Sequence, residues 1–580
     1  MPHARHATAP TASVTVSRRA FTGATAVGAA AIAAQLVSPA GTAAQAIAEG
    51  ASEETTDAGW LGEEPETPAE FSAEYDVDVV VVGLGHAGVA ATRAAAEAGA
   101  SVLAIEKGTD YGLGSKDCCA IGSKLFEERF PEIERYWKGA QSLLMNEISK
   151  GCLYRNDARI LHKWMQINGE NVDWYVSATP EESTSYGTSE NGNAVDSKAD
   201  YTLIAGGWPI PADYNPSAEN MPCLPGSFKM GGGVNKGFLA CNLDRAADAA
   251  GDRLTVLRDT RAIKLVKEDG RIVGVIARSA DGGYVKANAA SGVVLATGDF
   301  MNDEAMLAKF LPNVLSGGYV PNGDENWYMA KDADGNSTNT GDGHRMAVWA
   351  GARMQDYGCS MSHLTSNACS PFGTVPFLLL DRNGRRFMNE DVQGQQYAER
   401  VRQLPGRVAY QVYDASCFDE MPAMPYGHGK NPNATQEALA ERVKDGSTVK
   451  ADTLQELFAQ IDIDAEAAAR SVARYNELCA EGVDEDFGKT ATRMFAVETA
   501  PFYASQVKRG DDLVTMSGIV CDELCRAVDA NEDPIPGLYV AGNVQGGRFA
   551  VIYPESALGV SVAMALSFGR EAGGNAAAGI

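Results

Sequence analysis

The sequence is poor in positive charge and in clustered cysteine. Its 580 residues include 49 Lys and Arg against 76 Asp and Glu, which gives a formal net charge of −27. Such a surface repels a phosphate backbone, so we expect no nucleic acid partner. The 11 cysteines are too dilute for a disulfide scaffold, and no Cys-x-x-Cys-His motif for haem attachment occurs.

The cysteines fall into only two close groupings, Cys118–Cys119 and Cys521-x3-Cys525. Neither has the spacing of a zinc ribbon or a ferredoxin cluster. We therefore predict no metal site and interpret the cysteines as buried free thiols. An iron–sulfur cluster held by cysteines that the fold brings together stays an alternative.

The N-terminus reads as an export signal. Ser17-Arg18-Arg19-Ala20-Phe21 precedes a mildly apolar stretch over 22–37, and Ala44-Gln45-Ala46 follows. A basic segment, an apolar segment and an A-x-A site in this order form a signal peptide, and the paired arginines make it a twin-arginine signal. The apolar stretch is too short for a transmembrane helix, which needs about 20 residues. We predict export by the twin-arginine (Tat) machinery to an extracytoplasmic location.

Residues 1–46 would be the signal, and 47–74 would be a disordered linker, because this stretch is rich in Glu, Thr, Ala and Pro. The remaining length suits two or three domains at roughly 100–200 residues each.

A dinucleotide-binding fingerprint begins the mature chain. A run of β-branched residues over 76–82 leads into Gly83-Leu84-Gly85-His86-Ala87-Gly88, a helical segment over 89–98 and a second apolar run that ends at Glu106. In such a unit the glycines allow a tight turn, close approach of the pyrophosphate and helix packing, while the acid accepts from a ribose hydroxyl. The helix N-terminus offers N–H groups to the phosphates. His86 stands where small residues are usual, and it either covers the phosphates or contacts the cofactor directly.

Two distant segments favour FAD over NAD. Residues 536–543 read Pro-Gly-Leu-Tyr-Val-Ala-Gly-Asn, Ala296-Thr297-Gly298 ends a mid-chain strand, and residues 557–561 open a last helix that we expect to run to about Gly569. With these motifs the chain resembles, over about 75–575, the flavoprotein subunits of the fumarate reductase and succinate dehydrogenase superfamily. The resemblance implies non-covalent FAD, with the last helix pointing its N-terminus at the pyrimidine end of the flavin.

The resemblance also implies a fold and a set of cofactor residues. We predict an α/β fold with a Rossmann-like FAD-binding domain split into 75–358 and 505–580, and an α+β capping domain over 359–504 that closes over the substrate. Within the first part, 253–280 reads as a β-meander and 180–225 as a long surface excursion. The candidate FAD-binding residues are Gly83, Gly85, His86, Ala87, Gly88, Glu106, Lys107, Ser115, Ala120, Gly122, Ala262, Ala296, Thr297, Gly298, Asp342, Gly542, Asn543, Leu558, Val560 and Ser561.

The family's dicarboxylate site is largely lost. The first clamp histidine falls on His363, but the second falls on Val514 and the clamp arginine falls on Ala557. The arginine that serves as general acid falls on Gly394, eight residues past Arg386. A bound dicarboxylate needs paired charges, so fumarate and succinate are poor candidates, and small apolar replacements favour a larger, less charged ligand.

A loop before the last helix offers new groups. Its Tyr553-Pro554 resembles the Tyr-Pro-Gly of 3-ketosteroid Δ1-dehydrogenases, in which the tyrosine contacts the steroid ketone, although Glu555 stands here in place of glycine. A tyrosine hydroxyl can donate to a carbonyl and stabilise an enolate. We predict that Tyr553, with the His363 region, polarises the acceptor, and that Tyr397 or Arg400 supplies the proton.

The whole pattern resembles the exported single-flavin reductases of anaerobic gut actinobacteria, which reduce activated C=C bonds in unusual organic acceptors such as cardiac glycosides. It implies hydride transfer from FAD to an α,β-unsaturated small molecule other than fumarate, with electrons from a membrane-bound cytochrome or quinol oxidase. One alternative is the reverse reaction on a ketosteroid-like substrate, and a second is a genuine fumarate reductase-like enzyme. A third is a protein that uses FAD structurally or for electron transfer alone.

Overall fold

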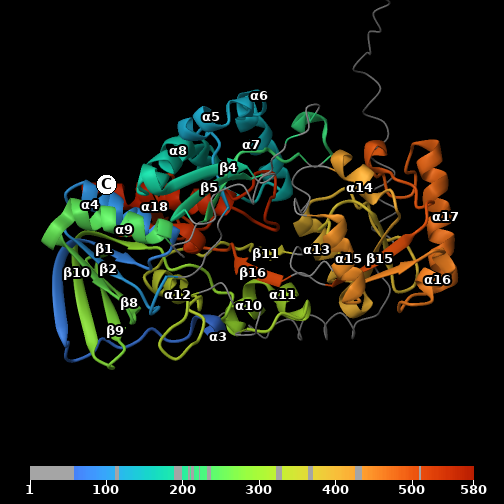
Figure 1. The fold of residues 1–580 in the computed structure, drawn as a ribbon. Coiled ribbons are helices and arrows are strands. Elements are labelled where there is room, and N and C mark those ends of the chain that lie inside the picture. Colours follow the sequence, from blue (N-terminus) through green and yellow to red (C-terminus); the bar gives the residue numbers. More distant parts are fainter. Residues whose placement is uncertain are drawn as a thin grey trace, which may run out of the picture. The chain divides into compact units, whose positions relative to one another are not determined.

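The computed structural model divides the chain into two units, Met1–Gly59 and Trp60–Ile580. The fold described here belongs to the second unit (Figure 1). The predicted signal over 1–46 lies outside the described residues, which are 58–111, 117–188, 199–206, 210, 214–220, 222–231, 237–321, 330–363, 370–424, 434–508 and 511–580.

The main sheet unites segments from both ends of the unit. Within the described residues it has eight strands, in the order β17-β18-β10-β1-β2-β7, with β9 and then β8 joined to β10. The pairs of β1 with β2 and β10, of β10 with β18 and of β2 with β7 are parallel. The strands are β1 (Ala73–Val82), β2 (Val102–Ile105), β7 (Leu254–Leu257), β8 (Thr260–Glu268), β9 (Arg271–Ser279), β10 (Tyr284–Leu295), β17 (Arg526–Val528) and β18 (Pro534–Val540).

The parallel strands are buried on both faces, as their unbroken valine and leucine runs predict. Val79, Val80 and Val81 of β1 are fully buried. The helices α4 (His86–Glu97), α9 (Gly237–Ala250) and α18 (Val560–Ala578) lie together over one face of this sheet in Figure 1. The predicted split Rossmann-like FAD-binding fold with an inserted cap is confirmed.

Helix α18 runs past the end at Gly569 that the sequence suggests. Gly569 and Gly573 are packing residues, because a Cβ on either would lie 2.2 Å from a backbone oxygen of α4. The two helices therefore meet through small residues, and the glycines allow close approach instead of ending the helix. The expected meander is present in β8 and β9, which turn at Asp269 (φ 46°) and Gly270 (φ 83°).

The stretch expected to be a surface excursion contains strands. β4 (Thr184–Thr188), β5 (Tyr201–Gly206) and β6 (Ser227–Gly231) form a four-stranded sheet with β3 (Asp117–Cys119), in the order β3-β6-β5-β4. Leu203 and Phe228 are buried and join the main core, beside helix α8 (Ala158–Val176). The helices α5 (Lys124–Arg129), α6 (Glu134–Trp137) and α7 (Ala140–Gly151) precede α8.

The inserted cap has a core of its own, built on the antiparallel sheet β12-β13-β15-β14. Its strands are β12 (Leu378–Asp381), β13 (Val408–Tyr413), β14 (Thr448–Ala451) and β15 (Phe502–Lys508). Its helices are α13 (Gly394–Val401), α14 (Cys417–Glu420), α15 (Gln436–Lys444), α16 (Leu454–Phe458) and α17 (Ala465–Glu481). β15 extends to Lys508, so the cap sheet reaches past the predicted boundary at 504.

Two short strands join the cap to the FAD-binding domain. β11 (Ser360–His363) pairs with β16 (Asp511–Thr515), and the pairing places Met361 opposite Val514. The remaining helices, α10 (Glu304–Phe310), α11 (Pro312–Ser316) and α12 (Asp342–Trp349), follow β10 in the chain.

The predicted linker over 47–74 is structured in its described part. It contains α3 (Ala58–Leu61) and the first residues of β1. Trp60 is buried against Phe310, with the two rings 4.9 Å apart, and its carbonyl accepts from Arg345 Nε at 2.8 Å. The acidic and proline-rich composition of 47–74 predicts disorder, but the buried side chain of Trp60 attaches this segment to the fold.

No helix among the described residues is both long enough and apolar enough to cross a membrane.

Candidate functional site

A cavity of about 500 Å³ opens at the carboxyl ends of β1 and β10, next to the first turns of α4 and α18. Most candidate cofactor residues line it, among them Gly83, Gly85, His86, Ala87, Glu106, Lys107, Ala262, Ala296, Thr297, Gly298, Asp342, Gly542, Asn543, Leu558 and Ser561. This is where an open parallel α/β sheet binds ligands.

The fingerprint glycines have different physical tasks. Gly83 has φ 97°, and a Cβ there would lie 2.4 Å from the carbonyl oxygen of Ala296. A Cβ on Gly88 would lie 1.8 Å from the carbonyl oxygen of Gly83, so this glycine lets α4 press against the turn. By contrast a Cβ on Gly85 would meet no atom within 4 Å. Gly85 therefore faces open space, as a ligand-facing glycine should.

Glu106 lies at the end of β2 and organises the backbone around this turn. Its carboxylate accepts from Leu84 N and from Gly108 N, each at 2.7 Å. Nearby, Asp342 at the first turn of α12 receives Lys107 Nζ at 2.9 Å and Arg261 Nη2 at 2.7 Å. Burial opposes ionisation of Asp342, but the two cations together lower its pKa to about 2.

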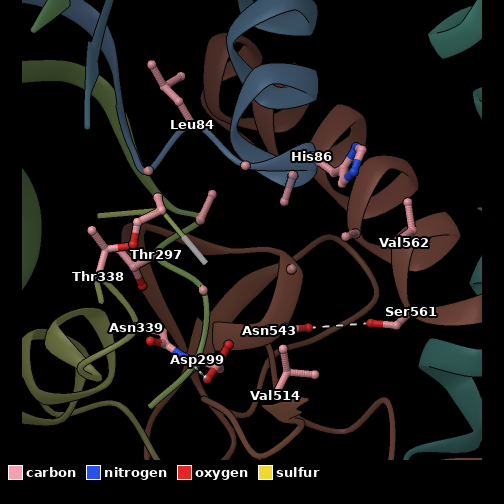
Figure 2. A pocket seen from close by; sticks show the side chains of 18 of the residues that line it. Leu84, His86, Thr297, Asp299, Thr338, Asn339, Val514, Asn543, Ser561 and Val562 are labelled. Atoms are coloured by element: carbon pink, nitrogen blue, oxygen red, sulfur yellow. Dashed lines mark hydrogen bonds between the residues drawn. The ribbon is translucent and has the colours of Figure 1, made fainter. Parts of the chain in front are cut away.

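Polar groups gather at the opposite end of the cavity. Asp299 receives Met301 N at 2.8 Å and Asn339 Nδ2 at 3.1 Å, yet burial raises its pKa to about 6. Ser561 in the first turn of α18 donates to Asn543 Oδ1 at 3.5 Å. Figure 2 shows Asp299, Asn339 and Asn543 with Val514 at this end, and Leu84 at the other.

The cavity fits FAD on three observations. Gly85 and Gly298 leave room where a Cβ would meet nothing. The hydroxyl of Thr297, which lines the cavity, is buried without a partner among the described atoms. Helices α4 and α18 follow a glycine N-cap, Gly85 and Gly559, without a side-chain cap, and the first-turn N–H groups of α4 remain for a ligand.

Arg548 is a buried cation beside this site. It is 0% exposed, and Nη2 donates to Asn543 Oδ1 at 3.0 Å. Nη1 has no partner among the described atoms, and burial lowers the arginine pKa to about 10. A buried positive charge would stabilise a neighbouring group that becomes anionic, as flavin does on reduction.

The family's clamp positions are apolar where they line the cavity. Val514 and Ala557 are both lining residues. In the described lining the only lysine or arginine is Lys107, and it is ion-paired with Asp342. Asp117, Asp299 and Glu555 also line the cavity, and burial raises the pKa of each of these three carboxyl groups.

Tyr553 lines the same cavity and is 4% exposed. Burial raises the pKa of its hydroxyl, which a backbone hydrogen bond from Ser561 partly offsets. The hydroxyl is therefore a proton-bearing donor at any physiological pH. Its ring packs edge-on against Phe549 at 5.3 Å, which fixes its direction.

Two of the other predicted catalytic residues, Tyr397 and Arg400, do not line the cavity. Tyr397 is fully buried in a cap cluster with Leu379 and Val401, because that face of α13 points into the cap core. Arg400 lies over the ring of Phe387 at 5.6 Å and does not line the cavity. His363 belongs to β11, but its side chain lies outside the described set.

Some predicted cofactor residues also lie away from the cavity. Gly88, Ala120, Gly122 and Val560 are not lining residues. Gly88 and Gly122 support backbone contacts instead, the latter against Gly169 of α8. Ser115 lies outside the described residues.

The lining also contains residues that the sequence did not single out for this site. They include Asp117, Leu239, Thr260, Asp299, Thr338 and Asn339. Asp299 directly follows Ala296-Thr297-Gly298, so this signature was the one signal that pointed to it. The ten cysteines among the described residues are free, and no group of three metal-binding side chains occurs among those residues.

A family model described as an FAD binding domain matches residues 234–560, more than half of the chain. The chain belongs to the FAD-binding fumarate reductase and succinate dehydrogenase flavoprotein family. A second model, glucose inhibited division protein A, matches residues 78–151.

Relatives match along most of the chain. A vinyl phenol reductase from Lactiplantibacillus plantarum is 26% identical over 538 residues, 87% of this chain and 97% of the relative. A fumarate reductase (cytochrome) from Shewanella frigidimarina is 27% identical, covering 89% of this chain and 78% of the relative. A digoxin reductase from Eggerthella lenta is 26% identical over 88% of this chain and 89% of the relative.

Among solved structures, a 3-ketosteroid-Δ4-(5α)-dehydrogenase from Rhodococcus jostii has a TM-score of 0.62 at 23% identity, covering 89% of this chain and 99% of that one. This likeness shows the shared fold of an FAD domain with a cap. The chain is an FAD-dependent oxidoreductase, and its relatives place it in the class that acts on CH–CH bonds.

Proposed function

We propose that this protein reduces the activated C=C bond of an α,β-unsaturated organic acceptor other than fumarate. The observation that carries the proposal is the charge of the cavity lining. Its lysine is paired with Asp342, and the family's clamp positions are Val514 and Ala557. A dianionic acceptor would meet carboxyl groups there and no unpaired lysine or arginine from the described lining.

When bound and reduced, FAD supplies a hydride to one carbon of the double bond. Tyr553 would donate a hydrogen bond to the acceptor's carbonyl oxygen, where negative charge develops. Its raised pKa keeps the hydroxyl proton in place, so Tyr553 orients and polarises without ionising. His363 would act in the same region. Val514 and Ala557 would pack against the apolar body of the acceptor.

The relatives support the reduction of a C=C bond and point to no single acceptor. Their names refer to vinyl phenol, acrylate, urocanate, digoxin and fumarate, which differ in size and charge. A family that serves such different molecules varies its acceptor site on a constant flavin domain.

We further propose that FAD is held non-covalently. The histidine of the described lining, His86, has its ring Nδ1 2.9 Å from the hydroxyl of Tyr175. Acid precipitation of the protein should release the flavin into the supernatant. A yellow pellet would contradict this proposal.

We propose that the protein is exported and receives electrons from a membrane-bound cytochrome or quinol oxidase. Arg18-Arg19 and the apolar segment after it support export through the twin-arginine pathway. Replacing both arginines by lysine should retain the protein in the cytoplasm. Unchanged export of that variant would contradict the proposed route.

The reaction is tested anaerobically with purified holoenzyme and reduced viologen. Enones, cinnamates, steroids and fumarate are compared as oxidants of the dye. We expect turnover with at least one enone or cinnamate and little with fumarate. Fast fumarate turnover would overturn our interpretation of Val514 and Ala557.

The second candidate is dehydrogenation of a ketosteroid-like substrate, which the position of Tyr553 in the cavity favours. In that case an oxidised dye would accept electrons from a saturated ketosteroid, and reduced dye would drive no alkene reduction. Binding of FAD without turnover in either direction would instead favour a structural or electron-transfer role.

A further inference from the structure

A carboxyl group lies where the fumarate reductase family has its proton-donating arginine. That position is Gly394 in this chain, and a Cβ there would lie 3.2 Å from Glu555 Oε2 and 3.6 Å from Oε1. The absence of a side chain at Gly394 thus makes room for the side chain of Glu555. The two residues are 161 positions apart in the chain, so the fold alone brings them together.

Glu555 is held from two sides. Its carboxylate accepts from Gln395 N at 3.0 Å, and its own N–H donates to Gln393 Oε1 at 3.0 Å. Gln393 also closes a capping box at the start of α13, so the cap helix and the Tyr553–Glu555 loop fix each other. Glu555 is half-buried and lines the cavity that Tyr553 also lines.

The carboxyl group is poised to carry a proton. Burial raises the pKa of Glu555 to about 7, against the lowering effect of the backbone N–H groups of Gln395 and Gly394. Among the described residues, the titratable groups that interact with it are Tyr553 and the Cys223 thiol, and burial raises the pKa of both, so both stay neutral. On α13, Glu399 lies 3.6 Å from Arg402, and Arg400 lies over Phe387. An acid with a pKa near the working pH is the best general acid.

Other acids at the cavity are worse placed for this task. Asp299 is held by two donors, Met301 N and Asn339 Nδ2, next to the Thr297-Gly298 turn of the flavin domain. Asp117 belongs to β3, which is attached to the start of α18 because the N–H of Cys119 in the same strand donates to the carbonyl of Gly559. Among the acids of the described lining, Glu555 is the one that comes from the Tyr553–Glu555 loop and bonds the cap, through Gln393 and Gln395.

We propose that Glu555 is the proton donor of the reduction and replaces the family's arginine. This inference rests on the proposed function. The O–H bond of the Glu555 carboxyl breaks, and a C–H bond forms at the acceptor carbon next to the carbonyl. The other carbon receives the hydride and its two electrons, so the double bond gains one H⁻ and one H⁺. The Glu555 carboxylate then takes a proton from solvent.

The test compares Glu555→Gln with the wild-type holoenzyme. The amide keeps the size and cannot donate an acidic proton, so kcat for an enone should fall by about 10²–10⁴-fold while flavin content stays the same. Wild-type kcat should fall as pH rises above about 7, because the carboxyl group loses its proton there. That pH limb and the solvent deuterium isotope effect on kcat should disappear in the variant. Glu555→Asp should restore part of the rate.

Glu441→Gln makes the same chemical change at an exposed position on α15 of the cap and serves as the matched control, so its kcat and pH profile should equal those of the wild type. Retention of the wild-type rate or of the pH limb by Glu555→Gln would overturn the inference and leave the proposed function intact. If the wild type itself reduces no enone or cinnamate, the proposed function fails and the inference falls with it.

Discussion

The two ends of the cavity are built in different ways. The flavin end is formed by backbone: Gly83, Gly85 and Gly298 shape it, and two uncapped helix starts face it. The other end, where we propose that the acceptor binds, is formed by side chains, chiefly Tyr553 and Glu555 of the loop before α18. Backbone geometry tolerates little change, whereas side chains can be exchanged one at a time. A family can therefore keep FAD and change its acceptor.

The largest effects should come from the flavin end. Substitutions at two of its glycines, Gly88 and Gly85, should separate an effect on stability from an effect on FAD binding. Gly88→Ala places a methyl group against the Gly83 carbonyl, so apoprotein stability should fall by about 3 kcal/mol or more. Gly85→Ala meets no protein atom, so the apoprotein should fold normally and lose affinity for FAD. Urea unfolding of the apoprotein and fluorescence titration with FAD measure the two effects.

The matched control is Gly574→Ala, an open position in α18. It should leave FAD affinity unchanged and raise stability by up to about 1 kcal/mol. Equal loss of FAD affinity in Gly85→Ala and Gly574→Ala would contradict the conclusion that Gly85 faces the ligand and Gly574 does not.

At the acceptor end, Tyr553→Phe removes one hydrogen-bond donor and keeps the ring packed on Phe549. We expect kcat for an enone to fall by about 10²-fold, the usual effect of losing one such donor, with flavin content unchanged. Steady-state kinetics with reduced viologen measure the change. A variant with wild-type kcat would remove Tyr553 from the mechanism.

An intermediate effect is expected where charge supports the flavin end. Asp342→Asn should lower the free energy of unfolding at pH 7 by about 2 kcal/mol, because the pKa of Asp342 is held near 2 in the folded state. Because the pKa of Asp342 is lower in the folded state than in the unfolded state, its ionisation stabilises the fold at pH values above the unfolded pKa of about 4. This stabilisation is lost as the pH falls from about 4 toward 2, where the folded-state carboxylate takes up its proton. The gap to wild type should therefore narrow below pH 4.

Urea unfolding at pH 7, 4 and 3 measures the difference in the free energy of unfolding between the wild type and Asp342→Asn. Asp252→Asn, at an exposed position, is the control and should change stability little at any pH. A gap for Asp342→Asn that does not vary with pH would show that its ion pairs with Lys107 and Arg261 are not the source of the stabilisation.

The smallest effect is expected in the cap core. Tyr397→Phe deletes a buried hydroxyl that has no partner among the described atoms. Stability should stay the same or rise by about 1 kcal/mol, because an unsatisfied buried polar group is removed. Turnover should not change. A large loss of kcat would return Tyr397 to the list of proton donors.

The flavin end could be predicted from sequence because its signals are local. The run over 76–82, the three glycines and Glu106 follow each other within one βαβ unit. Prediction from sequence failed where the structural role of a residue depends on contacts with distant parts of the chain. Gly569 reads as a helix end but packs on α4, and β4, with the sequence Thr-Ser-Tyr-Gly-Thr, lacks the apolar run that indicates a strand.

The acceptor end shows the same limit more sharply. Tyr553 could be found because its loop carries a recognisable Tyr-Pro. Glu555 was visible only as a departure from glycine, since its role depends on Gly394 and Gln395 across 160 residues of chain. Tyr397 could not be oriented without knowing which face of α13 meets the cap core.

We propose that the acceptor end has exchanged a dicarboxylate clamp for a neutral pair of proton-bearing donors, Tyr553 and Glu555. The most direct test is anaerobic stopped-flow reoxidation of the reduced holoenzyme, with an enone and with fumarate at equal concentrations. We predict rapid return of the oxidised flavin absorbance with the enone, and a rate for fumarate at least about 10²-fold slower, as expected when a carboxylate has no paired cation. Reoxidation by fumarate as fast as by the enone would contradict the account.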